Sequence, residues 1–222
     1  MTAVTCWLVR PGGVPARHLR LLDDDDRARA ARLRSPAAAS RFVRERAALR
    51  AILAASGAGP AEALRLSYGP AGKPLLPGGP AFSITHAGER SWIAVCADAE
   101  VGIDVVAPGF VEWSAVGGAW FAAEERAALA ALPPARAAAA ASGVWCRREA
   151  LVKAAGTGMA AGSDFVVSVG GPPRIVAARD DRFATERWSF AMLAADAEFD
   201  GAVAVAARAP HLTFRDAAAV FR

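Results

Sequence analysis

The sequence predicts an α+β fold made of two similar halves. Segments with helical patterning precede strand-like segments, and this order occurs twice along the chain, which favours α+β over a doubly wound fold. Residues 91–97 and 201–207 also share one rhythm of apolar and small side chains, as an internal duplication would produce. We therefore expect a pseudo-dimer of residues 1–106 and residues 107–222, each half with a long helix packed on a small antiparallel sheet.

The first half is expected to contain two helices followed by strands. Residues 6–9 read as a short apolar strand, and four aspartates at 23–26 precede a short helix at 27–34, where negative charge favours a helix N-terminus. A longer helix runs from Pro36 to about Ala55, and four arginines lie off its apolar stripe: Arg41, Arg44, Arg46 and Arg50. Strands are expected at residues 64–68, 81–85, 91–96 and 101–106, with the second and third forming a hairpin.

The second half repeats this order. A short helix is expected at residues 124–131, and Pro133 and Pro134 end it. A longer helix runs from about residue 135 to residue 155, where Gly156 and Gly158 end it. Strands follow at residues 165–169, 188–194 and 202–207.

The composition limits what the chain can be. Of its 222 residues, 54% are hydrophobic and 22% are charged, which excludes a disordered chain and supplies apolar material for a core. The net charge of +4 permits an acidic partner but does not require nucleic acid. The three cysteines include no Cys-x-x-Cys pair, so neither a disulfide framework nor a thiolate zinc site is expected. Since neither a signal-peptide pattern nor an apolar run of about 18 residues occurs, we expect a cytoplasmic protein that does not enter the membrane.

Two acidic residues stand in positions that call for a partner. Asp104 lies in the middle of the apolar strand 101–106, where it either caps neighbouring backbone or binds a hard metal ion such as Mg²⁺. Trp145, Glu149 and Lys153 share one face of the second long helix at i, i+4 and i+8. A solvated ion pair is the simplest interpretation of Glu149 and Lys153. However, the helix is otherwise rich in Ala, Val and Leu, and it ends in a glycine-containing loop that lets the backbone approach a ligand closely.

Two further side chains are candidates for the same site. His86 follows Thr85 at the end of a strand, where a histidine more often has a structural role than a functional one. Lys73 precedes Pro74 in a glycine-containing turn, where an amine and backbone N–H groups can meet a phosphate. An ordinary surface turn is the alternative for Lys73.

Together these signals are specific. The chain resembles the 4′-phosphopantetheinyl transferases of the surfactin-synthetase-activating type in segments that occur in the same order and spacing: Gly72-Lys73-Pro74, Phe82-Ser83-Ile84-Thr85-His86, Gly102-Ile103-Asp104, Phe121 followed by Glu124-Glu125, and the helix from Trp145 to Lys153. The resemblance extends from about Arg27 to about Ala207. It implies a monomer whose two α+β halves form a pseudo-dimer.

The resemblance also implies an activity and its site. Enzymes of this family move phosphopantetheine from coenzyme A to a serine of an apo acyl or peptidyl carrier protein and release adenosine 3′,5′-bisphosphate. By resemblance, Asp104 and Glu149 bind Mg²⁺ with support from Glu125. Glu149 also acts as the base, and Lys153 contacts phosphate. The resemblance places the remaining residues around the coenzyme: Lys73, Pro74, Thr85 and His86 at its phosphates and adenine, and Arg41 and Arg44 as candidates for its 3′-phosphate.

One departure from the family pattern keeps an alternative open. Many relatives have a second acidic residue where this chain has Val106, and Val106 cannot bind a metal. A pseudo-enzyme that binds coenzyme A without transferring from it is therefore one alternative. A nucleic-acid binder is a second, suggested by the arginines at residues 27–50, although nothing in the sequence places aromatic side chains on a basic face for base stacking. An acyl-CoA acyltransferase is a third, but it would need no Mg²⁺, and Asp104 speaks against it.

Overall fold

The computed structural model describes the chain except for residues 13, 108–119, 159–160, 162–163, 194–197 and 222. The helices are α1 Asp24–Ala31, α2 Pro36–Ala55, α4 Ala123–Ala130 and α5 Pro134–Ala155. The strands are β1 Ala3–Val9, β2 Ser67–Tyr68, β3 Pro74–Leu75, β4 Ala81–Ala87, β5 Arg90–Cys96, β6 Val101–Val106, β7 Phe165–Val167, β8 Ile175–Ala178, β9 Ser189–Met192, β10 Asp200–Val205 and β11 His211–Asp216. Within these residues, none of the helices combines the length and hydropathy that crossing a membrane requires.

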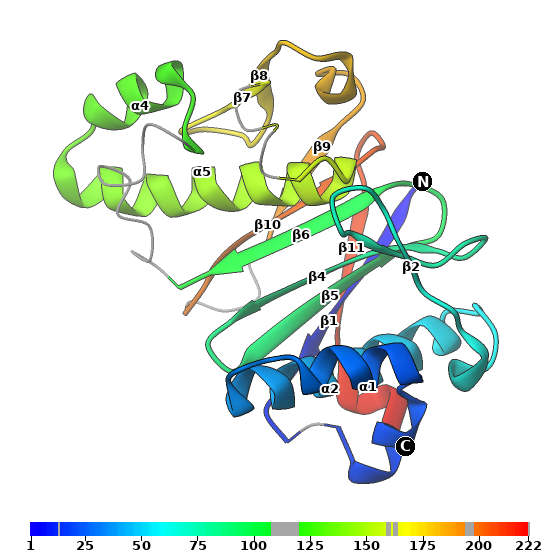
Figure 1. Cartoon of the computed structure of the whole chain (residues 1–222). Coiled ribbons are helices and arrows are strands. Elements are labelled where there is room, and N and C mark those ends of the chain that lie inside the picture. The colour runs from blue at the N-terminus through cyan, green and yellow to red at the C-terminus, as the bar shows by residue number, and fades with distance from the viewer. Residues whose placement is uncertain (13, 108–119, 159–160, 162–163, 194–197, 222) are drawn as a thin grey trace.

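These elements form four layers, with two sheets between two long helices (Figure 1). The first sheet has the strand order β11-β1-β5-β4, and the second has the order β6-β10-β9. Because side chains alternate along a strand, Trp7 of β1 packs in the cluster with Leu49 of α2, whereas Cys6 packs between the sheets with Val203 of β10. The neighbouring Ala202 belongs to the cluster that α5 covers.

The fold class predicted from the sequence is confirmed, because helices and small antiparallel sheets make up the molecule. The strand at 101–106 and the long helix at 36–55 have the expected bounds. The strand expected at 64–68 is wrong for its first three residues, since only Ser67–Tyr68 pairs, with β3. The strands β8 and β11 were not expected, and β11 pairs with β1 in parallel, so the first sheet is not purely antiparallel.

The two sheets exchange strands across the boundary expected between residues 106 and 107. Strand β6, which precedes this boundary, pairs with β10 and not with the strands of the first sheet. Strand β11, which comes from the end of the chain, pairs with β1. Each sheet is nevertheless covered by one long helix, of 20 residues in α2 and 22 residues in α5.

The arginines of α2 do not share one solvated face. Arg50 is fully buried, and its guanidinium donates hydrogen bonds to Asp23, Asp26 and the Leu64 carbonyl. Arg46 is also buried and pairs with Asp26. These ion pairs fasten the N-terminal end of α1 to the middle of α2, so neither arginine is available to an external phosphate.

One glycine lies where β6 contacts α5, and a second ends α5. A Cβ atom at Gly102 would lie 1.9 Å from the carbonyl oxygen of Ala150 and 2.4 Å from the backbone nitrogen of Ala154. The backbones of β6 and α5 are therefore in direct contact at this point. Gly156 ends α5 with a φ of 67°, a left-handed conformation that glycine adopts without strain.

Candidate active site

Strand β6 and helix α5 bring the predicted acidic and basic residues together. Gly102, Asp104 and Val106 alternate along β6 on the side that faces α5. From α5, the Lys153 ammonium donates a hydrogen bond of 2.7 Å to Asp104 Oδ1 and one of 3.3 Å to the Ile103 carbonyl. The pairing of Asp104 with Lys153 thus links the two segments that carried the sequence prediction.

The two carboxylate oxygens of Asp104 have different surroundings. Oδ1 accepts hydrogen bonds from Lys153 and, at 2.9 Å, from the Thr85 hydroxyl on β4. Oδ2 is buried and has no hydrogen-bond partner among the residues that the structure describes. A buried carboxylate oxygen without a donor is costly, so Oδ2 is a candidate ligand for a cation.

Glu149 lies one turn before Lys153 on α5 and is half-buried. Burial raises the pKa of Glu149, and the Asp104 carboxylate raises it further, against the opposing effect of Lys153 and Arg148. The two carboxyl groups are therefore near enough to repel each other. A carboxylate destabilised in this way is more easily protonated and is suited to accept a proton.

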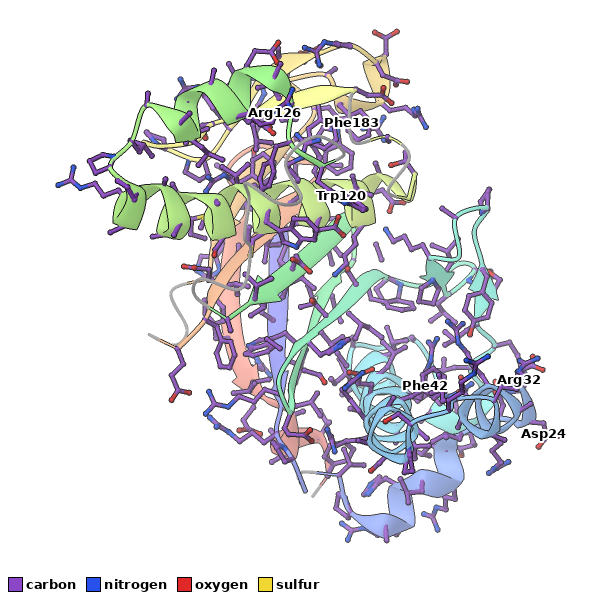
Figure 2. The ribbon with its side chains drawn as sticks, turned by 60° about the vertical axis from the view of Figure 1, so that its left-hand side comes forward. Asp24, Arg32, Phe42, Trp120, Arg126 and Phe183 are labelled. Atoms are coloured by element: carbon purple, nitrogen blue, oxygen red, sulfur yellow. The ribbon has the colours of Figure 1, made fainter. Side chains whose placement is uncertain are left out.

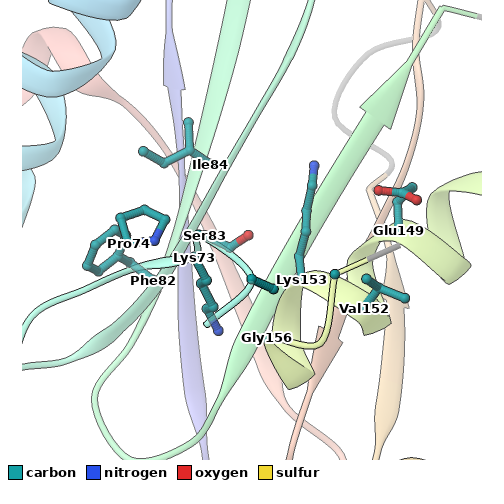
Figure 3. Close-up of a pocket in the computed structure, with 12 residues that line it drawn as sticks. Lys73, Pro74, Phe82, Ser83, Ile84, Glu149, Val152, Lys153 and Gly156 are labelled. Atoms are coloured by element: carbon teal, nitrogen blue, oxygen red, sulfur yellow. The ribbon is translucent and has the colours of Figure 1, made fainter. Parts of the chain in front are cut away.

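Glu149 and Lys153 line a cavity of about 250 Å³ (Figure 3). Its walls come from the turn before β3, from β4, and from the last turns of α5 with the loop that follows. The lining residues are Ala71, Gly72, Lys73, Pro74, Phe82, Ser83, Ile84, Glu149, Val152, Lys153, Gly156 and Gly158. The structure thus brings Lys73 and Pro74 to the same cavity as Glu149 and Lys153.

Ser83 is a site residue that the sequence did not single out. Its hydroxyl accepts a hydrogen bond of 3.2 Å from the Ile103 backbone N–H, so it joins β4 to β6 beside the cavity. Thr85 does the same two residues later through Asp104. The spacing of the two hydroxyls on one face of a strand was the signal that could have identified this role.

His86 lies at the exposed end of β4 and lines a different cavity, of about 200 Å³, together with Val106. Partial burial lowers the pKa of His86, and Arg41 and Lys153 lower it further, against Glu45 and Asp104. His86 is therefore within electrostatic range of the Asp104–Lys153 pair. Val106, where relatives have an acid, is buried among apolar side chains.

The two arginines expected at the 3′-phosphate have acidic neighbours within the chain. Arg41 pairs with Glu45 at 3.7 Å on α2. Arg44 donates a hydrogen bond of 3.2 Å to the Glu89 carbonyl in the β4–β5 turn. Neither arginine lines the cavity that holds Glu149 and Lys153.

Glu125 is fully buried in another set of contacts. Its Oε1 accepts hydrogen bonds from Arg148 and from the Val167 backbone, and its Oε2 accepts from Arg148 and from the Ala122 backbone. Both oxygens are satisfied, and Glu125 is absent from the cavity lining. These contacts join α4, α5 and β7 through Glu125, and its supporting role at a metal stays a prediction.

An aromatic cluster continues the Glu149–Lys153 face of α5. The ring of Trp145 lies 5.4 Å from that of Trp120 and 6.4 Å from that of Phe121, measured between centroids. Trp120 lies beside α5 in Figure 2. Packing against these two rings explains the aromatic residue at position 145, one turn before Glu149 on the same face of α5.

The donor set can be tested for its fit to Mg²⁺. No group of three or more His, Cys, Asp and Glu side chains that could hold a metal occurs in the described parts of the chain. Mg²⁺, however, commonly takes one or two carboxylates and completes its shell with water and substrate phosphates. Asp104 Oδ2, which has no partner in the described segments, and the destabilised Glu149 carboxylate fit such a shell.

The chain is similar to a named protein and to one family model. The chain is similar to a protein of Synechocystis sp. named "Putative 4′-phosphopantetheinyl transferase", with 29% identity over 155 residues, which cover 66% of this chain and 62% of that protein. The chain therefore matches less than two thirds of the length of this relative. Residues 100–204 match the family model of the 4′-phosphopantetheinyl transferase superfamily. This segment contains β6 and α5, so Asp104, Glu149 and Lys153 all lie within the part of the chain that is similar to this superfamily.

Proposed function

We propose that the protein transfers the 4′-phosphopantetheine group of coenzyme A to a serine of an apo acyl or peptidyl carrier protein. The observation that carries the proposal is the buried Asp104 Oδ2, which has no donor among the residues described and lies beside Lys153 and within electrostatic range of Glu149. The superfamily match of residues 100–204 supports the same reaction class.

In this proposal the serine oxygen attacks the phosphorus that carries the pantetheine arm. A new phosphorus–oxygen bond forms to serine, and the bond to the adenosine 3′,5′-bisphosphate oxygen breaks. The Glu149 carboxylate accepts the serine proton. The Lys153 ammonium stabilises the negative charge that develops on the departing phosphate.

Asp104 and Glu149 are the residues that would hold Mg²⁺. When bound, Mg²⁺ would supply neutralisation of the pyrophosphate charge. Thr85 supports Asp104 from β4 through its hydrogen bond to Oδ1, whereas Oδ2 has no donor within the part of the chain that the structure describes.

In this proposal, coenzyme A contacts Pro74, His86, Arg41 and Arg44. Pro74 lines the cavity that holds Glu149 and Lys153. Arg41 is close enough to His86 for its charge to lower the pKa of that imidazole. Arg44 would reach a phosphate only by leaving the Glu89 carbonyl. We also propose that the protein acts in the cytoplasm. We propose that it acts as a monomer, because each sheet has its apolar faces covered within one chain.

A transfer assay tests the proposal directly. The protein is incubated with coenzyme A, Mg²⁺ and a panel of apo carrier proteins, and the mass of each carrier is measured. We expect a mass gain equal to one phosphopantetheine on at least one carrier, and its loss when a chelator removes divalent metal. Binding of coenzyme A without any mass gain across the panel would instead identify a pseudo-enzyme, and full transfer in excess chelator would refute the metal role.

A further inference from the structure

Lys73 is fully engaged by the protein itself. Its ammonium donates hydrogen bonds to the Ala154 carbonyl at 3.0 Å, to the Glu100 carboxylate at 3.1 Å and to the Val101 carbonyl at 3.3 Å. A lysine ammonium has three N–H donors, and these contacts use all of them. The Lys73 side chain is also largely covered, at 11% exposure.

Two of the three acceptors lie in the two elements that carry the site, and the third, Glu100, directly precedes β6. Val101 is the first residue of β6, and Asp104 follows it by three positions. Ala154 lies in the last turn of α5, next to Lys153, where carbonyl groups have no partner within the helix. A cation at this end of a helix is favourable on both hydrogen-bonding and electrostatic grounds.

The direction of the side chain separates Lys73 from the reacting groups. In Figure 3, Lys73 extends away from the Lys153 ammonium and from the Glu149 carboxylate, although all three residues line one cavity. Its stem passes close to Gly156, where a Cβ atom would lie 3.6 Å from Lys73 Cδ. The end of α5, the start of β6 and the turn before β3 therefore meet at this one ammonium.

We infer that Lys73 is a positioning residue, which holds the end of α5 against the start of β6 and so keeps Lys153 and Asp104 in register, and does not bind the coenzyme phosphates. The inference rests on the proposed function for its link to turnover. A direct phosphate ligand and a positioning residue predict different results when the ammonium is removed. Loss of a phosphate ligand weakens coenzyme binding, whereas loss of a positioning contact lowers the rate at saturating substrate.

The test is Lys73→Met, which keeps an unbranched side chain and removes the ammonium. We expect turnover at saturating coenzyme A and carrier to fall by about 10- to 100-fold, because small displacements of reacting groups have effects of this size. The dissociation constant of coenzyme A, measured by calorimetry without metal, should change by less than about threefold. Weakening of about tenfold or more, as expected for loss of a charged hydrogen bond to a phosphate, would overturn the inference.

A readout that does not depend on activity completes the test. Hydrogen exchange should become faster at the Gly156 and Thr157 amides, which bond to the Val152 carbonyl at the end of α5, and should stay unchanged in α2. Unchanged exchange at these amides overturns the positioning role, even where turnover falls. If the wild-type protein modifies no carrier, the proposed function fails, while exchange and coenzyme affinity still decide the role of Lys73.

A second variant covers the case in which Lys73→Met fails to fold. Glu100→Gln alters the most exposed of the three acceptors and keeps both carbonyl contacts. It should change turnover and exchange in the same direction as Lys73→Met but by less, with coenzyme affinity unaltered. A weaker coenzyme affinity in Glu100→Gln, with normal exchange, would count against the inference.

Discussion

Asp104 and Glu125 are both buried carboxylates, yet their hydrogen bonds give them different roles. Both carboxylate oxygens of Glu125 accept a backbone hydrogen bond, and Arg148 donates to both, so the contacts within the protein satisfy this carboxylate. Asp104 has two donors at Oδ1 and none at Oδ2 among the described residues. Because a buried acceptor without a donor destabilises the folded state, it points to a ligand that the protein meets in function.

At the residue scale, Glu149 and Lys153 give the most direct prediction. Glu149→Ala should lower phosphopantetheine transfer by about 10²-fold or more, because it removes the proposed base and a proposed metal ligand. Lys153→Ala should lower it by roughly 10²-fold, because the departing phosphate loses its cation. The measurement is carrier modification by mass spectrometry, with circular dichroism to establish that both variants fold. A solvated surface pair would leave transfer unchanged.

The control for these variants has to come from an exposed part of α5. Arg136 lies in the exposed first turn of α5, so Arg136→Ala should leave transfer within about twofold of wild type. Arg147 looks equally suitable in the sequence, since it lies off the Glu149–Lys153 face. The structure excludes it, because Arg147 is buried and donates a hydrogen bond of 2.8 Å to the Ser168 carbonyl.

At the element scale, the spacing between β6 and α5 decides where the site residues lie. Gly102 has no side chain where the Ala150 carbonyl and the Ala154 nitrogen of α5 approach β6. The contact lies between Lys73 at one end of β6 and the Asp104–Lys153 pair further along the strand. A shift of α5 would therefore move Lys153 and Glu149 relative to Asp104.

Gly102→Ala tests this spacing. The added methyl group would overlap backbone atoms that cannot rotate away, so we expect a loss of about 1–3 kcal/mol or more in the free energy of unfolding. Transfer by the folded fraction should fall as well. Gly170→Ala is the matched control, since a Cβ there meets nothing within 4 Å. Urea unfolding of both variants measures the effect, and equal stabilities would show that β6 and α5 can separate at little cost.

The elements that the sequence predicted well are those with strong local signals. Helix α2 begins at Ser35 and Pro36, where the Ser35 side chain accepts a hydrogen bond from the Ala38 backbone, and β6 is apolar on both faces because both are covered. Strands β8 and β11 were missed because they are mostly exposed, so they lack a buried face that alternation could reveal.

Contacts between distant residues account for the differences at the site. The Asp104–Lys153 and Glu149 group was predictable, since each residue stands out within its own element. The contacts of Lys73 and Glu125 were not, because their partners lie far away in the sequence, at Ala154 and at Arg148. A turn lysine and a helix glutamate have the same local pattern whether their partner is a ligand or the protein itself.

At the scale of the whole molecule, the chain does not divide cleanly in its middle. Strand β11 supplies the partner of β1 in the first sheet, and β10 supplies the partner of β6. The layer between the sheets contains Cys6 and Cys96 from one sheet and Val203 and Val205 from the other. Each half of the sequence therefore completes a sheet and covers an apolar face that the other half would leave open to water.

This interleaving predicts that residues 1–106 will not fold alone. Separated from the rest, they would lose the β1–β11 and β6–β10 ladders and expose the face of the first sheet that the second sheet covers. Exposed apolar surface costs roughly 25 cal/mol per Å², and a chain of this size has only a small stability to lose.

Circular dichroism during urea titration should show no cooperative transition for residues 1–106. Mixing with residues 107–222 should restore one, together with transfer activity. A cooperative transition in the isolated segment would instead establish the first half as an autonomous domain, and the pairing across residue 106 would then be a docking contact between two folded units.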